Sequence, residues 1–251
     1  MSYSFLVVTL LSVALGGCSE GVLNPKGPIA AAERLILFNS LGIMLAIVTP
    51  TILATLAAAF WFRASNRRAA YLPDFEYSGR LELLVWSIPA MTVLLVGGVA
   101  WIGAHDLDPR KAIASTVRPV AVQVVSLDWK WLFIYPEQCI ASVNQLVVPV
   151  GTPISFELTS STVMNSFFVP QLGSQIYTMS GMVTRLQLQA DHLGTYPGRS
   201  TMFSGEGFSD MRFSVDAMTE DGFAQWVRQA HETGPALDRQ SYADLAKPSK
   251  A

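Results

Sequence analysis

Side chains able to bind a soft transition metal are few in this chain. It holds two cysteines and three histidines among 251 residues. Cys139, His192 and His231 are scattered over the C-terminal half, and the glycine-containing stretch 203–214 has neither a thiol nor an imidazole. Thiolates and imidazoles are the ligands that copper prefers in proteins. A soft-metal site in this part of the chain would therefore have few ligands to draw on.

Each of these residues also has a structural interpretation. Cys139 is expected to be a small, buried thiol, and His192, in the sequence Asp-His-Leu-Gly, a turn residue. Met179, Met182 and Met211 could form a copper-binding methionine cluster, but scattered core methionines are the simpler interpretation.

Glu82 is the ionisable residue of most functional interest. It comes one residue before the uncharged run 83–104. A carboxylate at the rim of a low-dielectric segment can collect protons and pass them to an internal water chain. The alternative is an ordinary acid in the first turn of a helix, where the helix dipole stabilises negative charge. The residues alone leave both interpretations open.

Two uncharged stretches flank the region of Glu82 and predict membrane-spanning helices. As α-helices, 35–62 and 83–104 would be about 42 and about 33 Å long, and a hydrocarbon core is about 30 Å thick. Charged residues make up only 14% of the chain, against about 25% in soluble domains. Arginines are concentrated in the connection 63–82, so the positive-inside rule predicts a cytoplasmic loop with both termini outside.

The N-terminus predicts a lipidated, exported protein. A short apolar run ends in Leu15-Gly16-Gly17 before Cys18, which resembles the lipobox of bacterial lipoprotein signal peptides. Cys18 would then carry the lipid and become the new N-terminus. The run is too short for a comfortable transmembrane span. An ordinary signal peptide or a mis-chosen start codon is the alternative.

The C-terminal half predicts an all-β sandwich followed by a helix. Short alternating strands are broken by Gly and Pro at the spacing typical of sandwiches. The expected strands are 119–127, 129–135, 143–149, 154–159, 183–189 and 211–215. Thr219 is a candidate N-cap for a helix with one apolar stripe. The polar residues after it are expected to be mobile or docked on a partner.

The full predicted order is signal peptide 1–17, periplasmic segment 18–34, transmembrane helix 35–62, cytoplasmic loop 63–82, transmembrane helix 83–104, linker 105–118, periplasmic β-domain 119–218, helix 219–232 and polar tail 233–251.

A Trp-rich stretch, Asp128-Trp-Lys-Trp-Leu-Phe-Ile-Tyr-Pro136, opens the β-domain. After a transmembrane hairpin it resembles subunit II of the haem–copper respiratory oxidases, and segments 163–170, 172–177 and 180–182 resemble the quinol-oxidising branch, the bo-type ubiquinol oxidases. The resemblance covers roughly residues 18–232. It implies a two-helix transmembrane hairpin followed by an all-β, cupredoxin-like sandwich with a C-terminal helix.

The resemblance also bears on copper. In the cytochrome c oxidase branch this domain holds a binuclear copper centre, bound by two Cys thiolates, two His imidazoles, a Met thioether and a Glu carbonyl, a set suited to copper. The corresponding positions here are Asn165, Phe203, Gly205, Gly207, Met211 and Ser214. Both thiolates and both imidazoles are missing. We therefore expect no metal or other cofactor bound by this chain and no cytochrome c partner.

What the resemblance implies is a non-metallated subunit II of a proton-pumping ubiquinol oxidase in the bacterial inner membrane. The complex would oxidise ubiquinol and reduce dioxygen to water, with two haems and one copper in subunit I. Subunit I, smaller membrane subunits and membrane lipids are the expected partners. The chain would have a structural and assembly role. In the family, an acidic residue at the place of Glu82 lies at the mouth of a proton-uptake path.

Other functions fit the sequence less well. An electron-accepting cytochrome c oxidase subunit fails because the ligands are missing. A free-standing, lipid-anchored periplasmic binding or sensor protein would have the same topology and is the remaining alternative. Nucleic-acid binding is set aside, because a formal net charge of −2 provides no basic footprint.

Overall fold

The computed structural model describes residues 21–70 and 72–249. The chain divides into two compact units, one of residues 35–106 and the other of the residues before and after that range. The first unit is built from two long helices, α2 (Pro28–Trp61) and α3 (Gly79–Asp106). The start of α2 belongs to the second unit.

Both helices are long and apolar enough to cross a membrane, with mean hydropathies of 2.2 and 2.1. Their apolar side chains surround the helix axis, a pattern of helices that are buried or lipid-exposed rather than surface-lying. Gly103 is buried where the two helices meet. The helices approach so closely there that a β-carbon on this residue would lie 2.6 Å from Cδ1 of Ile36. The predicted pair of apolar helices is therefore present.

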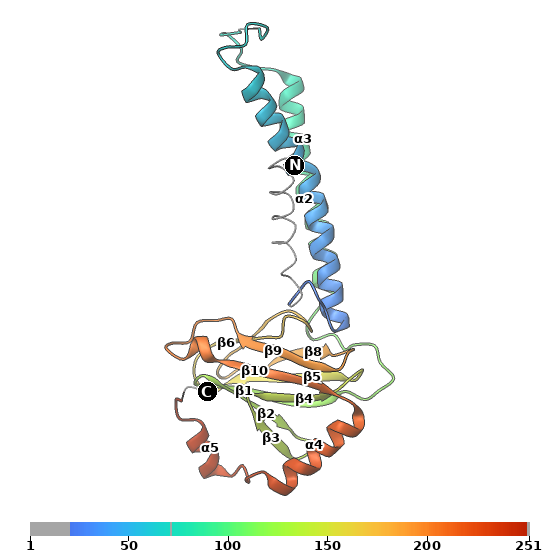
Figure 1. The fold of residues 1–251 in the computed structure, drawn as a ribbon, viewed down its shortest axis with the longest axis vertical. Coiled ribbons are helices and arrows are strands. Elements are labelled where there is room, and N and C mark those ends of the chain that lie inside the picture. Colours follow the sequence, from blue (N-terminus) through green and yellow to red (C-terminus); the bar gives the residue numbers. More distant parts are fainter. Residues whose placement is uncertain (1–20, 71, 250–251) are drawn as a thin grey trace, which may run out of the picture. The chain divides into compact units, whose positions relative to one another are not determined.

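The second unit is a sandwich of two five-stranded sheets (Figure 1). Sheet A has the order β3-β2-β1-β5-β8 and sheet B the order β4-β10-β9-β6-β7. The pairs β1–β5 and β10–β4 are parallel and the other pairs antiparallel. The strands are β1 (Val120–Leu127), β2 (Lys130–Tyr135), β3 (Ile140–Val143), β4 (Gln145–Pro149), β5 (Pro153–Ser160), β6 (Asn165–Phe168), β7 (Ile176–Thr178), β8 (Thr184–Gln189), β9 (Gly194–Ser200) and β10 (Arg212–Met218).

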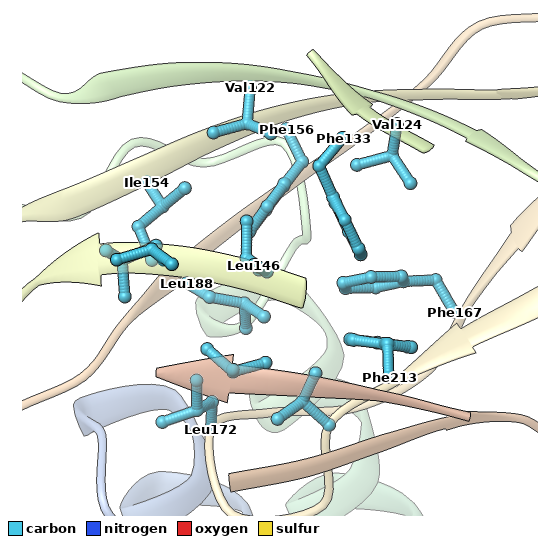
Figure 2. Packing of buried hydrophobic residues seen from close by; sticks show 14 of the residues in the cluster. Val122, Val124, Phe133, Leu146, Ile154, Phe156, Phe167, Leu172, Leu188 and Phe213 are labelled. Atoms are coloured by element: carbon cyan, nitrogen blue, oxygen red, sulfur yellow. The ribbon is translucent and has the colours of Figure 1, made fainter. Parts of the chain in front are cut away.

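Aromatic rings from both sheets fill the space between them (Figure 2). Phe167 of sheet B stacks on Phe213, with centroids 4.9 Å apart and planes 16° from parallel. Phe133 of sheet A meets Phe213 at 5.4 Å, and Trp131 meets it at 5.5 Å. Because every second residue of a strand points inward, these rings form one core, and the predicted all-β sandwich is confirmed.

Helix α4 (Glu220–Thr233) packs against β3, β4 and β10. As predicted, Thr219 is its N-cap, and its side chain accepts a hydrogen bond from the amide of Gly222 at 3.1 Å. Trp226 packs on Tyr135 with centroids 5.3 Å apart. The apolar stripe of α4 thus extends the core of the sandwich.

The residues leading into α2 form part of the β-rich unit. The amide of Lys26 donates to the carbonyl oxygen of Gln171 at 2.7 Å, and its own carbonyl accepts from the amide of Asp191 at 2.7 Å. The amide of Ala30 donates to the carbonyl of Leu172 at 3.2 Å. We call residues 26–30 the N-terminal clamp. It fixes the start of α2 to two loops of the sandwich.

The polar tail packs on its own sandwich, whereas the sequence suggested a mobile segment or one docked on a partner. It contains a short helix, α5 (Arg239–Leu245). The ammonium of Lys130 donates to the carbonyls of Leu245 and Lys247, at 2.7 and 2.9 Å, and to Oγ of Ser249 at 2.7 Å. Burial lowers the pKa of this ammonium, an effect that the carboxylate of Asp128 opposes. Carbonyls at a helix C-terminus are natural partners of a cation.

Candidate functional site

Trp129 covers the 203–214 loop. It occupies the turn between β1 and β2 with a left-handed φ of 64°, which is uncommon outside glycine. Its indole N–H donates to the carbonyl oxygen of Ser204 at 3.0 Å. Its ring lies against Gly207, where a β-carbon would come within 2.8 Å of Cε3. The sequence had suggested that Trp129 begins the strand; instead it closes the turn and covers the loop.

The loop is tightly turned beneath this ring. Gly205 has a φ of 101°, a conformation that glycine adopts without steric cost. Three backbone hydrogen bonds, each 3.2 Å long, stabilise this turn. The amides of Phe208, Asp210 and Met211 donate to the carbonyl oxygens of Gly205, Gly207 and Phe208, respectively. They enclose the 3₁₀ turn η2 (Phe208–Asp210). The loop therefore satisfies much of its backbone internally.

A buried network of hydroxyls and one amide lies in the sandwich beside the loop. Asn165 is 1% exposed. Its Oδ1 accepts from Oγ of Ser200 at 3.2 Å, and its Nδ2 donates to Oγ of Ser126 at 3.4 Å. Ser126 in turn shares a 3.0 Å hydrogen bond with Thr178. We call Ser126, Asn165, Thr178 and Ser200 the buried hydroxyl network.

Two of the six copper-ligand counterparts are brought close to each other. Met211 is 1% exposed and belongs to the hydrophobic core. Its carbonyl accepts from the amide of Ser200 at 3.1 Å, and the hydroxyl of the same serine donates to Asn165. Asn165 and Met211 are thus joined through one residue.

The other counterparts do not converge with them. Gly205 and Gly207 carry no side chain and lie under Trp129. Phe203 is 75% exposed and contacts Phe208 edge-on at 5.7 Å. Oγ of Ser214 donates to the carboxylate of Asp216 at 3.4 Å, on the face of sheet B that points away from the core. The six positions surround the loop without forming one cage.

The residues around the loop do not fit a copper centre. Its surroundings supply hydroxyl, amide and backbone oxygen atoms, which are hard donors, together with one thioether. Within residues 21–70 and 72–249, no three His, Cys, Asp or Glu side chains are grouped closely enough to hold a metal ion. The side chains present thus fill and cover this region of the sandwich.

The scattered metal-ligand residue types lie elsewhere. The expectation of a buried thiol at Cys139 is wrong, because this residue is exposed in the β2–β3 turn, with a φ of 53°. His192 is exposed in the bend between β8 and β9, as a turn residue should be. His231 Nε2 is hydrogen bonded to the carbonyl of Gln138 at 2.8 Å. Met182 is 53% exposed, so it is not a core methionine.

Glu82 lies in the first turn of α3. Trp86, one helical turn further on, donates its indole N–H to Oε2 of Glu82 at 3.0 Å. The amide of Glu82 donates to the carbonyl of Ser78 at 2.9 Å. The carboxylate therefore has a defined partner that orients it beside the apolar part of the helix.

Comparison with known proteins identifies the family. A family model described as "Cytochrome C oxidase subunit II, periplasmic domain" matches residues 136–218. The "Cytochrome bo(3) ubiquinol oxidase subunit 2" of Pseudomonas aeruginosa is 46% identical, over 98% of this chain and 76% of that protein. The chain belongs to the ubiquinol oxidase subunit 2 family. The "Ubiquinol oxidase subunit 2" of Acetobacter aceti is also 46% identical, over 95% of this chain and 78% of the relative.

Membership of the ubiquinol oxidase subunit 2 family confirms the resemblance inferred from the Trp-rich stretch and the later segments. Among solved structures, the periplasmic domain of subunit II of cytochrome oxidase from Bradyrhizobium japonicum aligns with a TM-score of 0.46 at 19% identity, over 49% of this chain and 100% of that one. The fold is the two-helix pair followed by the cupredoxin-like sandwich and C-terminal helix. Cys18 lies outside the described residues.

Sequence reasoning missed two residues of this ubiquinol oxidase subunit 2 family member. Trp129 was not distinguished from its aromatic neighbours, although the residue before it, Asp128, is of a type that favours turns. In the structure, Oδ1 of Asp128 accepts a hydrogen bond from Oγ1 of Thr162 at 2.6 Å. Lys130 was not recognised as a partner of the tail, because its acceptors are mainly backbone carbonyls distant in sequence. Such contacts leave no local sequence pattern.

Proposed function

We propose that this chain is the copper-free subunit II of a proton-pumping ubiquinol oxidase. The observation that supports this best is the 203–214 loop, whose ligand counterparts offer no thiolate or imidazole and whose space is taken by Trp129 and the buried hydroxyl network. In the complex, a partner subunit I would hold two haems and one copper, oxidise ubiquinol and reduce dioxygen to water. Ubiquinol is lipid-soluble, so its electrons can enter within the bilayer without a periplasmic copper relay.

The proposed location is the bacterial inner membrane. The arginine-rich connection between α2 and α3 favours a cytoplasmic position for residues 63–82, which leaves the sandwich in the periplasm. Lipidation of Cys18 would add an anchor on that same side. A single acyl chain binds membranes only marginally, so the two helices would provide most of the anchoring.

The proposed role is structural, as an anchored cap on subunit I. Among the described residues, no other part of the chain buries the most apolar stretch of either helix. A β-carbon at Gly97 or Gly98 would meet nothing within 4 Å, and small residues of this kind allow the close approach of other membrane helices. Subunit I and smaller membrane subunits are the partners that would cover these faces.

Glu82 is proposed to contribute to proton uptake from the cytoplasmic side. It would stand at the cytoplasmic end of α3, and Trp86 orients its carboxylate through a hydrogen bond. A carboxylate held at the edge of a low-dielectric region can accept a proton from bulk water and pass it on. No step of the redox chemistry is assigned to this chain.

Purification of membranes through a tag on the full chain tests the proposed complex. We expect a haem-bearing partner in the difference spectrum, oxygen consumption that depends on ubiquinol, and no copper centre with thiolate charge-transfer bands on this chain. A chain that leaves mild detergent without a haem-bearing partner would support the free-standing sensor instead. Stoichiometric copper bound by this chain would contradict the proposal directly.

The role of Glu82 is tested in the same preparation with Glu82→Gln, using Glu76→Gln in the adjoining loop as a matched control. Glu82→Gln should slow turnover several-fold and reduce proton uptake, while Glu76→Gln should change neither. Trp86→Phe removes only the indole donor and should give an intermediate loss. Unchanged oxygen consumption and proton uptake in Glu82→Gln would remove this residue from the path.

A further inference from the structure

Two arginines lie directly opposite each other on the outer face of sheet B. Arg199 of β9 pairs with Arg212 of β10 in the antiparallel register, and both are exposed. Like charges at directly opposed positions destabilise a sheet. In the free chain this pair therefore carries an electrostatic cost.

Nothing in the described part of the chain neutralises the pair. None of the ion pairs among residues 21–70 and 72–249 includes Arg199 or Arg212. The acid on the same face of β10 is Asp216, whose carboxylate already accepts from Gln145 and Thr195, each at 2.7 Å. The nearby loop acids, Glu206 and Asp210, are exposed and form no ion pair with either arginine.

Aromatic residues lie near the two arginines in the sheet and in the adjoining loop. Phe168 of β6 lies opposite Arg199 in the register. Nε of Arg212 donates to the carbonyl of Ser209 at 3.3 Å, and Ser209 belongs to the η2 turn, which begins at Phe208. Phe203, on the same loop, is 75% exposed and contacts Phe208. We call Arg199, Arg212, Phe168, Phe203 and Phe208 the arginine–phenylalanine surface.

We propose that the arginine–phenylalanine surface binds a carboxylate-bearing patch on a partner protein of the oxidase complex. Arginine and aromatic residues are the types enriched where binding energy concentrates in protein interfaces. A guanidinium binds a carboxylate through two parallel hydrogen bonds, so two adjacent arginines suit a pair of acidic side chains. The inference rests on the proposed function, since the partner is a subunit of that complex.

A protein surface fits this site better than a lipid headgroup. Exposed rings such as Phe203 gain from burial in a shaped pocket that excludes water around the charged groups, and a hydrated headgroup layer offers no such pocket. Binding of acidic side chains would also remove the repulsion between Arg199 and Arg212. The arginine pair would then destabilise the free chain and stabilise the complex.

The test uses the full tagged chain in membranes, with the double variant Arg199→Gln/Arg212→Gln. Arg228→Gln/Arg239→Gln, which removes the same charge from exposed positions on α4 and α5, is the matched control. We expect the first variant to retain about tenfold less haem-bearing partner through a salt wash, and the control to match the wild type. The thermal midpoint of the free Arg199→Gln/Arg212→Gln chain should be equal to or above that of the wild type, because repulsion is removed.

Arg199→Lys/Arg212→Lys keeps both charges and should recover most of the partner at low salt. Equal retention of partner by wild type and the glutamine variant would overturn this inference and leave the proposed function intact. Absence of any haem-bearing partner on the wild type would instead count against the proposed function. A lysine variant that is folded but binds no better than the glutamine variant would overturn the electrostatic basis. Unchanged partner retention, with lost binding only to phosphatidylglycerol vesicles, would identify a lipid and overturn the proposal.

Discussion

The hydroxyl of Tyr135 serves both backbone groups of Val147: it donates to the carbonyl oxygen at 3.0 Å and accepts from the amide at 2.8 Å. Tyr135 belongs to sheet A, whereas Val147 lies on β4 at one edge of sheet B. A single buried side chain thus ties the two sheets together and closes part of an edge strand.

Tyr135→Phe should therefore lower the free energy of unfolding. The substitution leaves a buried N–H and a buried C=O without a partner, and each such group costs about 1–3 kcal/mol. Urea unfolding of the full chain in detergent measures the change, with Tyr242→Phe, an exposed tyrosine in α5, as the control. Equal stability of Tyr135→Phe and the wild type would contradict the importance of this contact.

The same residue predicts a loss of stability at alkaline pH. Burial raises the pKa of the Tyr135 hydroxyl well above its ordinary value of 10.0, and burial likewise raises the pKa of Tyr196. Above about pH 10 the unfolded chain releases these protons before the folded chain does. Stability is then fully present below that pH and decreases as pH rises toward the folded-state pKa. Tyr135→Phe should flatten this decrease, and a slope identical to the wild type would contradict the prediction.

Gly207→Ala should destabilise the chain through Trp129. The added β-carbon would press on the indole ring, and overpacking of this kind costs about 1–3 kcal/mol. The cost should shrink in a Trp129→Ala background, where the ring is gone. A double-mutant cycle of thermal stability measures this coupling. Additive effects of the two substitutions would show that the ring and the glycine do not act on each other.

Restoring the copper ligands should convert the loop into a metal site. The required changes are Asn165→His, Phe203→Cys, Gly205→Glu, Gly207→Cys, Met211→His and Ser214→Met. The new thiolates and imidazoles suit copper, and the side chain at position 207 must displace Trp129. We expect copper binding together with a change in tryptophan emission, relative to a variant that lacks only the two cysteine substitutions. Failure to bind copper would count against a cupredoxin-like backbone around the loop.

Gly27→Ala should loosen the N-terminal clamp. Gly27 is buried, and a β-carbon there would collide with the carbonyl oxygen of Gln189. Gly42→Ala is the matched control in α2, since a β-carbon at Gly42 meets nothing within 4 Å. Limited proteolysis before α2 should become faster in Gly27→Ala alone. Protection equal to the wild type would mean that the clamp tolerates the added carbon.

The sequence predicted the strongly patterned elements and missed those with weak patterns. Six strands were anticipated in β1, β2, β4, β5, β8 and β10. Strand β9 was missed because it carries Gly194, Pro197 and Gly198, residues that usually end strands. Pro197 is tolerated because β6 pairs with β9 only at its end, through Phe167 and Phe168, so the proline needs no ladder partner on that side. Whether a strand has such an unpaired stretch depends on the order of the strands in the sheet, and this order is not evident from the sequence.

The candidate site was predictable in composition and less so in geometry. The absence of thiolates and imidazoles at the ligand counterparts could be read directly from the residues. The cover of Trp129 over Gly207 could not, since it depends on a left-handed turn that tryptophan seldom adopts. Cys139 was misjudged for a similar reason: its positive φ sets it in an exposed turn, whereas free cysteines are usually buried.

The hydrogen bonds at the margins of the sandwich bear on whether its sheets can pair with another copy of the chain. On β4, Tyr135 satisfies the outward-facing groups of Val147, and on β8, the other sheet's edge, the amide of Gln187 donates to the carbonyl of Pro109 at 2.9 Å. Open strand edges are the route by which β-proteins polymerise. Because this chain caps two of its margins with its own residues, the sandwich offers fewer open edges at which a second copy could add a strand.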